Sequence, residues 1–348
     1  MHKNQPYYVK TNNVLAQKRV STMIYYLFPR ASLQVNNRCK IQYSTHLPAV
    51  CYSFSLCHYL NEILNIVSKI PIWNQMCLQT HPYSHIEHIS KVKMPAICYE
   101  LMELYYLMNF SWESFSKINS LHLGNGQSVA AIQHIRKRTS NHHSYDQYMV
   151  LEQHSLNAFM SFTRASMDLT FCEACKGTEY ENALELFKQL CVVFCVQKRK
   201  GTCIVKYGET FTHLSLEILT LLSHFYEKTY FVKPSACILT SGEKYLVCKG
   251  FVYESIGDKM FQTFFHMYKS ILECPPGKYI EHILQPNIPM FLWARLEEIN
   301  SIFGQPRLEQ MNHLLNSYVE QGGNGGMWNN METKDMSKCR EWCEKHGL

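Results

Sequence analysis

The chain has 348 residues, of which 46% are hydrophobic and 18% are charged, with a net charge of +6. This composition supports a large hydrophobic core and excludes an intrinsically disordered chain. No apolar run reaches the ~18 residues that a membrane span needs, so no membrane association is expected. The first residues, MHKNQPYYVK, lack the apolar segment of a secretory signal. The 15 cysteines are therefore expected to be reduced thiols of an intracellular protein.

Residues 1–93 form the first of four expected segments and are predicted to be a helical N-terminal region. The candidate helices there are Met23–Phe28 and Cys51–Lys69. Residues 256–321 are also predicted to be helical, mainly over Met260–Leu272 and Met290–Phe303. Residues 322–348 begin with the spacer GGNGG and continue into a short helix over Lys334–Lys345.

Residues 94–255 alternate between helical patterns and short apolar runs that are typical of strands. The helices are expected over Met94–Met108, Ser128–Arg136, Thr178–Val196 and Thr212–Glu227. The strands are expected over Ser120–Leu123, Tyr148–Leu151, Asp168–Cys172, Thr202–Lys206, Thr229–Lys233 and Lys244–Cys248. This alternation predicts an α/β fold, a Rossmann-like sheet with helices on both faces. The last two strands have no helix between them and are expected to form a hairpin.

Two features mark a candidate cofactor site. Gly124, Asn125 and Gly126 follow the first strand of the segment and precede a helix, where glycines allow a ligand to approach the backbone. Glu152 ends the next strand, where nucleotide-binding sheets place a carboxylate for ribose hydroxyls. A plain strand–helix turn and a solvated glutamate explain these residues equally well.

Three charged residues at strand ends form a candidate catalytic site. Lys206 ends a strand after an apolar run, Glu173 follows another strand, and Glu243 precedes a third. Because adjacent strand ends meet at the ligand crevice of an open α/β sheet, these side chains are expected to converge. A lysine between carboxylates can orient and deprotonate a sugar hydroxyl. No pair of cysteine or histidine pairs has zinc-finger spacing, so no metal site is expected.

Three segments resemble the methyltransferase region of the large polymerase (L) protein of non-segmented negative-strand RNA viruses, such as rhabdoviruses and bornaviruses. They are GTCIVK at 201–206, SGEKYLVCKG at 241–250 and LHLGNGQS at 121–128. The resemblance implies a Rossmann fold that binds S-adenosyl-L-methionine (SAM). It also implies methylation of the mRNA cap at guanine N7 and at the first ribose 2′-oxygen. The implied partners are capped RNA and viral polymerase or nucleoprotein components, in the cytoplasm or nucleus of a host cell or in a virion.

The resemblance also assigns a Lys-Asp-Lys-Glu catalytic tetrad. Its third and fourth members are Lys206 and Glu243, and Glu173 stands where the family has Asp. The first lysine belongs on the helix before the glycine loop, at a position that aligns with Tyr99. Ser128 replaces the third glycine of the loop. The segment after Glu152 that frames the adenine is short.

These departures predict a cap methyltransferase with weakened or lost activity. Two hypotheses remain open. The chain is either a SAM-dependent enzyme, or a non-catalytic descendant that binds RNA or a polymerase, such as a relic of an integrated viral gene. A purely structural helical protein does not explain the segment around Lys206 and Glu243.

Overall fold

The central element is a β-sheet. Seven strands of the described residues form it, in the order β1-β7-β8-β6-β5-β3-β4. The computed structural model describes residues 23–91, 93–94, 96–107, 118–124, 126–137, 146–149, 159–160, 162–174, 177–285, 288–320 and 332–348. The strands are β1 (Ile24–Phe28), β3 (Ser120–Leu123), β4 (Asp146–Met149), β5 (Met167–Glu173), β6 (Gln197–Tyr207), β7 (Tyr226–Lys233) and β8 (Lys244–Phe251).

The expected mixture of parallel and antiparallel strands is confirmed. Strands β4, β3, β5 and β6 are parallel, and β8 runs antiparallel to both β6 and β7. Strands β6 and β7 therefore run in the same direction, and both end at the edge of the sheet where β5 and β3 also end. This common edge gathers the carboxyl ends of five of the described strands (β3, β4, β5, β6 and β7), where open α/β sheets bind their ligands.

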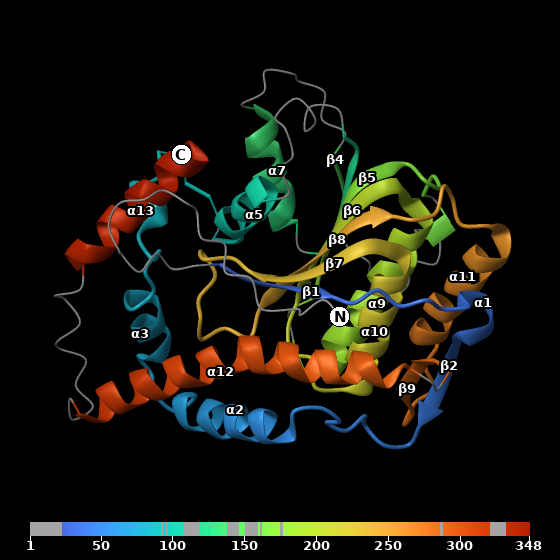
Figure 1. Cartoon of the computed structure of the whole chain (residues 1–348), viewed down its shortest axis with the longest axis horizontal. Helices are drawn as coiled ribbons and strands as arrows, with labels where there is room; N and C mark the ends of the chain where they lie inside the picture. The colour runs from blue at the N-terminus through green and yellow to red at the C-terminus, as the bar shows by residue number, and fades with distance from the viewer. Residues whose placement is uncertain are drawn as a thin grey trace.

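Helices cover both faces of the sheet, as the alternating pattern predicts (Figure 1). One core packs α9 (Glu179–Val196), α10 (His213–Phe225) and α11 (Asp258–Leu272) against side chains such as Leu123 and Val205. The other core packs α5 (Ala96–Leu107) and α7 (Gln127–Lys137) against the opposite side chains of the same strands, such as Phe171 and Ile204. Successive residues of a strand point to opposite faces. One set of strands therefore supports both cores.

The strongest local signal in the sequence, the start of α9, forms as expected. The Thr178 hydroxyl accepts a hydrogen bond from the Glu181 backbone N–H, and Glu181 Oε2 accepts one from the Thr178 backbone N–H at 2.7 Å. Such a capping box satisfies free donors of the first turn and contributes about 1 kcal/mol. It determines where α9 begins, directly after the end of β5.

The N-terminal region corrects one prediction. Met23–Phe28 does not form a helix, because Ile24–Phe28 is the edge strand β1, antiparallel to β7. Five residues are too few for a stable helix, whereas aromatic residues suit a strand with one buried face. Tyr26 and Phe28 are buried, and Leu27 between them is exposed. The N-terminal region thus completes the sheet instead of forming only helices.

The other N-terminal elements flank this strand. The predicted helix over Cys51–Lys69 is confirmed as α2 (Phe54–Val67). The remaining elements are α1 (Val35–Arg38), β2 (Cys39–Ser44), α3 (Trp73–Gln79) and α4 (Ile86–Ile89). Strand β2 pairs with β9 (Tyr279–Leu284) in a separate two-stranded sheet, so the region after residue 255 is not wholly helical either.

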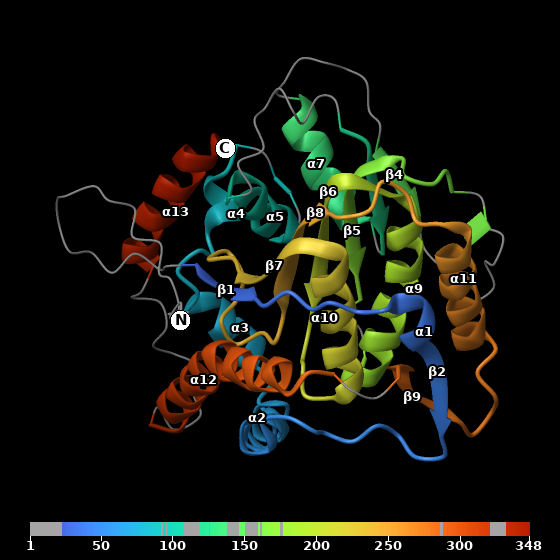
Figure 2. The same cartoon turned by 45° about the vertical axis from the view of Figure 1, so that its right-hand side comes forward.

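Helix α12 (Met290–Glu320) extends beyond the predicted end at Phe303, and α13 (Glu332–His346) follows near the carboxyl terminus. Gly304 and Pro306 would ordinarily end a helix. Here α12 continues because it packs along α2, which lies beside it in both views (Figures 1 and 2). A Cβ on Gly304 would lie 2.6 Å from Leu56 Cδ2, so glycine here lets the two helices pack closely without displacing the Leu56 side chain.

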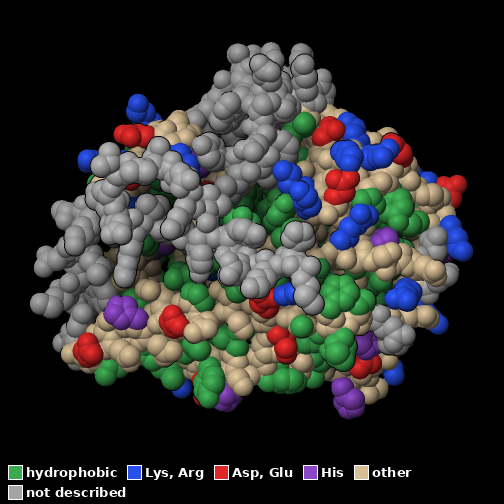
Figure 3. All heavy atoms as spheres, in the orientation of Figure 1, with side chains coloured by type: hydrophobic (Ala, Val, Ile, Leu, Met, Phe, Trp, Pro, Cys, Tyr) green, Lys and Arg blue, Asp and Glu red, His purple; other side chains and the backbone are tan. Residues whose placement is uncertain are grey.

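The lower part of the face in Figure 3, over α2 and α12, carries hydrophobic side chains. Phe54 and Tyr59 of α2 and Phe291 of α12 are among the exposed large hydrophobic residues. None of the described helices is both long enough and apolar enough to cross a membrane.

Candidate functional site

The carboxyl ends of β3, β5 and β6 bring three of the predicted site residues to the same edge of the sheet. Glu173 is the register partner of Lys206, and Leu123 is the partner of Cys172, so Gly124 follows beside Glu173. This placement is what parallel strands require, because their ends share one edge. Asn125 and Glu152 lie outside the described residues.

Lys206 occupies the centre of the site, between two carboxylates. Its Nζ lies 3.0 Å from Glu243 Oε2 and 3.9 Å from Glu173 Oε1. The side chains of Lys206 and Glu173 are only 10% and 8% exposed, whereas that of Glu243 is 35% exposed. Lys206 and Glu173 are therefore almost fully sheltered from solvent, and Glu243 is the most exposed of the three side chains.

The backbone of Glu173 is held in place by Gln189 of α9. The Gln189 side-chain oxygen accepts a hydrogen bond from the Glu173 N–H at 3.0 Å, and its Nε2 donates to the Glu173 carbonyl at 2.9 Å. Gln189 is itself buried. Both backbone groups at the end of β5 are thus satisfied by one amide, which leaves the carboxylate to face Lys206.

Gly124 makes a close approach to the same carboxylate residue. Its φ is +136°, a conformation that favours glycine. A Cβ built on Gly124 would lie 2.9 Å from Glu173 Cβ and 3.2 Å from its carbonyl oxygen. The loop can therefore pass the end of β5 only without a side chain at this position.

The loop continues into α7 through Gly126, whose φ is +82°. Ser128, which replaces the third glycine expected of the loop, is buried in the first turn of α7. Its hydroxyl shares a 2.7 Å hydrogen bond with Nδ1 of His122, a buried residue of β3. The Ser120 hydroxyl lies 3.0 Å from the other ring nitrogen of His122. The serine therefore ties α7 to β3 from inside the fold.

Helix α5 carries Tyr99, the residue that aligns with the first tetrad member, and next to it Glu100. Tyr99 packs edge-on against Trp342 of α13, with ring centroids 6.0 Å apart, and its hydroxyl accepts a hydrogen bond from the Met94 N–H. The α5 side chain that interacts with Lys206 is the next one, Glu100. The 3.6-residue period turns adjacent side chains of a helix about 100° apart. A shift of one residue therefore changes which face of α5 the side chain occupies.

Glu100 adds a third carboxyl group to the surroundings of Lys206. It is buried, and its Oε2 accepts a hydrogen bond from the hydroxyl of Tyr245, the register partner of Lys206. Burial raises the pKa of Glu100, and the positive charge of Lys206 acts in the opposite direction. The structure thus has a buried acid next to Tyr99, the position that the resemblance assigns to a lysine.

Two further residues hold the turn that carries Glu243. Glu103, one helical turn after Glu100, accepts hydrogen bonds from the backbone N–H groups of Ser235 and Ala236, each at 3.1 Å. Lys233 Nζ donates to the carbonyls of Ser241 at 2.6 Å and of Glu243 at 3.2 Å. Both positioning residues were missed from the sequence. For Glu103 the sequence carried a signal, because Glu100 and Glu103 are two acidic residues three positions apart on an otherwise apolar helix.

The comparisons with known proteins agree with this geometry. The family model described as FtsJ-like methyltransferase matches residues 107–251, from the end of α5 to the end of β8. The match supports a SAM-dependent methyltransferase region in this part of the chain. A comparison with curated protein sequences finds no significant match.

Similar solved structures include three proteins. A probable spermidine synthase from Corynebacterium glutamicum is 11% identical, with a TM-score of 0.33, over 61% of this chain and 80% of that one. Human methyltransferase-like protein 13 in complex with SAH is 11% identical, with a TM-score of 0.29, over 51% and 91%. CurJ carbon methyltransferase is 10% identical, with a TM-score of 0.26, over 55% and 70%.

Proposed function

We propose that this protein binds SAM and transfers its methyl group to a ribose 2′-hydroxyl of RNA, at a rate below that of an unaltered Lys-Asp-Lys-Glu site. The observation that carries the proposal is the position of Lys206, at hydrogen-bonding distance from Glu243 and close to Glu173 at the carboxyl edge of the sheet. The match of residues 107–251 to FtsJ-like methyltransferases supports the same chemistry.

The residues at the end of β3 fit the cofactor. Gly124 and Gly126 leave the loop without side chains next to the N-terminus of α7, whose helix dipole favours electron-rich groups of a bound ligand. The cradle at Gly124 is one that a Cβ would fill. When bound, SAM would supply an electrophilic methyl group on a sulfonium. Asn125 and Glu152 complete this proposed cofactor set.

The chain's own contribution to the reaction is to orient the acceptor and to handle its proton. The ion pairs of Lys206 with Glu173 and Glu243 fix the direction of Nζ. A ribose hydroxyl beside Nζ is held by hydrogen bonding to it. Once Nζ has given one of its own protons to water, its lone pair accepts the hydroxyl proton as the oxygen is methylated. Such positioning converts a diffusional encounter into a defined geometry, which is the larger part of the catalytic gain for a simple group transfer.

Capped RNA is the proposed substrate, and guanine N7 is the proposed second acceptor. These finer assignments, and the proposed origin in a viral polymerase gene with polymerase or nucleoprotein partners, rest on the resemblance of residues 201–206 and 241–250. They extend the broader support for an RNA substrate that comes from the family match.

One observation favours a second candidate function, a non-catalytic module that binds RNA. Glu100 places an additional carboxyl group near Lys206, where the resemblance predicts a positive charge. When this carboxyl group is ionised it favours the charged form of the lysine, which cannot accept a proton. RNA phosphates would also lose a cation that attracts them.

The test is methylation of a capped oligonucleotide with labelled SAM, comparing Lys206→Arg with Lys198→Met. Lys198 lies at the other end of β6, where its Nζ pairs with Asp168 at 3.0 Å, outside the proposed site. The arginine keeps the charge between the carboxylates but cannot accept a proton. We expect a loss of roughly 10²-fold for Lys206→Arg and wild-type activity for Lys198→Met.

Circular dichroism establishes that both variants are folded. Equal activity of wild type and a folded Lys206→Arg variant would contradict the assigned role of Lys206. The absence of methyl transfer by the wild type, together with binding of the oligonucleotide, would favour the non-catalytic module.

A further inference from the structure

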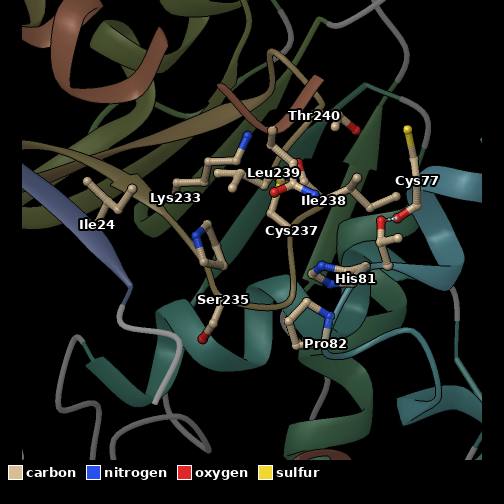
Figure 4. Close-up of a pocket in the computed structure, with 13 residues that line it drawn as sticks. Ile24, Cys77, His81, Pro82, Lys233, Ser235, Cys237, Ile238, Leu239 and Thr240 are labelled. Atoms are coloured by element: carbon tan, nitrogen blue, oxygen red, sulfur yellow. Dashed lines mark hydrogen bonds between the residues drawn. The ribbon is translucent and has the colours of Figure 1, made fainter. Parts of the chain in front are cut away.

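We propose that a hollow between the turn after β7 and the segment joining α3 to α4 binds one nucleobase of the RNA substrate. This inference rests on the proposed function and adds a substrate subsite to it. The cavity measures about 190 Å³. Figure 4 shows Ile24 and Lys233 coming from the sheet, and His81 and Pro82 coming from the helical segment. Gln310 of α12 also lines the cavity.

The size of the cavity suits one flat ring. A protein cavity of about 150 Å³ accommodates a benzene molecule, so about 190 Å³ accommodates a six-membered base ring with its exocyclic groups. Ile24, Pro82 and Leu239 supply apolar walls against the faces of a ring. Bases that lie outside a duplex are recognised by such contacts to their faces, together with hydrogen bonds to their edges.

Polar groups of the cavity offer the hydrogen bonds that a base edge requires. Nε2 of His81 lies 3.1 Å from the carbonyl oxygen of Ala236, which can only accept, so Nε2 carries the hydrogen. Burial lowers the pKa of His81 to about 4, which keeps the ring neutral at pH 7 and leaves Nδ1 as an acceptor. The amide of Gln310 offers both a donor and an acceptor.

The cavity lies at the correct edge of the sheet for this role. Lys233 lines it and ends β7, and its ammonium donates to the carbonyl of Glu243, whose carboxylate contacts Lys206. Strand β7 is two positions from β6 in the sheet, which corresponds to about 10 Å between the strands. A nucleotide next to the methylated one can span this distance.

The cavity is separate from the cofactor loop. Strand β3, which leads to Gly124, is four positions from β7 in the sheet, which corresponds to about 19 Å. The Lys206 cluster lies between the two. The arrangement therefore has the cofactor on one side of the acceptor hydroxyl and a base of the same RNA on the other.

The experiment uses capped 10-nucleotide RNAs with a 3′ fluorophore, each with one abasic position, and the full-length protein. Binding is measured by fluorescence anisotropy, and methyl transfer with labelled SAM is measured on the same RNAs. We expect the wild type to bind one of these abasic RNAs about tenfold more weakly than the others. This loss corresponds to the contacts and hydrogen bonds of one buried base.

Two variants and a control test whether the loss of affinity at the abasic position arises in the cavity. Leu239→Trp fills the cavity, and Gln310→Leu removes the amide while retaining the length of the side chain. Gln305→Leu is the matched control on the same helix, because Gln305 is exposed and bonds only locally, to Glu309 at 3.0 Å. We expect the abasic penalty to disappear in the first two variants and to persist in Gln305→Leu.

The outcomes separate this inference from the proposed function. Equal binding of all the RNAs by the wild type, or an abasic penalty that persists in Leu239→Trp, overturns the pocket even if the RNA is methylated. Loss of the penalty in the two pocket variants supports it. If that loss occurs while the wild type transfers no methyl group, the proposed function fails and the base pocket stands.

Discussion

The contact between Gly124 and Glu173 allows a sharp test of how rigid the edge of the sheet is. The change is Gly124→Ala, and its matched control is Gly277→Ala. Both glycines have a positive φ, +136° and +74°, and both variants bear the strain of an L-residue in that conformation. Only Gly124 has a close neighbour, because nothing lies within 4 Å of a Cβ built on Gly277.

The expected magnitudes follow from this difference. A positive φ costs a non-glycine residue roughly 1–2 kcal/mol, which both variants share. At Gly124 the new Cβ would lie 2.9 Å from Glu173 Cβ, whereas carbon atoms prefer about 3.5–4.0 Å. Glu173 cannot move away freely because Gln189 holds its N–H and carbonyl. Overpacking of this kind costs about 1–3 kcal/mol more.

We therefore expect Gly124→Ala to lower the free energy of unfolding by about 2–5 kcal/mol and Gly277→Ala by about 1–2 kcal/mol. The assay is denaturant unfolding monitored by circular dichroism, with the midpoint and slope compared for the three proteins. Equal losses in the two variants would show that β5 yields to the new methyl group. The end of β5 would then not be the rigid platform for Lys206 that the site requires.

Three further predictions concern the cofactor, the acid near Lys206 and a buried histidine. Because the glycine loop is altered and the segment after Glu152 is short, SAM is expected to bind with a Kd of roughly 1 mM or weaker, and low-micromolar binding in an NMR titration would contradict this. Glu100→Gln removes an ionisable carboxyl group near Lys206 and is expected to raise methyl transfer to capped RNA roughly tenfold; an unchanged rate would exclude Glu100 as the cause of weak activity. The pKa of His81 in the folded protein, about 4, lies below its ordinary value of 6.5. The unfolded chain therefore binds the proton first, and stability present above pH 6.5 is lost between pH 6.5 and 4, by up to ~3 kcal/mol. Unfolding of His81→Gln measured beside the wild type should lack this component, and parallel pH profiles would refute it.

Much of the architecture could be predicted from the sequence because its signals are local. The capping box at Thr178 and Glu181 marks the start of α9, and the period of apolar residues determines its length. Strands that alternate with helices must run parallel to form right-handed crossovers. That rule predicted that Gly124, Glu173 and Lys206 would lie at one edge, and the register of β3, β5 and β6 places them there.

The errors arose where partners distant in the sequence decide the structure. Met23–Phe28 carries no information about β7, which lies some 200 residues later, yet pairing with β7 makes this segment a strand. Gly304 and Pro306 predict a helix end, and only packing against Leu56 of α2 explains why α12 continues. Local propensity is a weak preference of about 1 kcal/mol per residue at most positions, and the burial of a full helix or strand face outweighs it.

The site divides in the same way. The charges on Lys206, Glu173 and Glu243 and their positions at strand ends could be read from the sequence, because a strand end is a local feature. The identity of the α5 side chain near Lys206 could not, because the rotation of a helix about its axis is determined by packing. The α5 side chain that interacts with Lys206 is Glu100, and the aligned Tyr99 next to it packs against α13 instead. The sequence by itself thus determined which charged residues stand at the strand ends. Only the tertiary structure decided which other side chains surround Lys206, because burial against α13 and the sheet determines the rotation of α5.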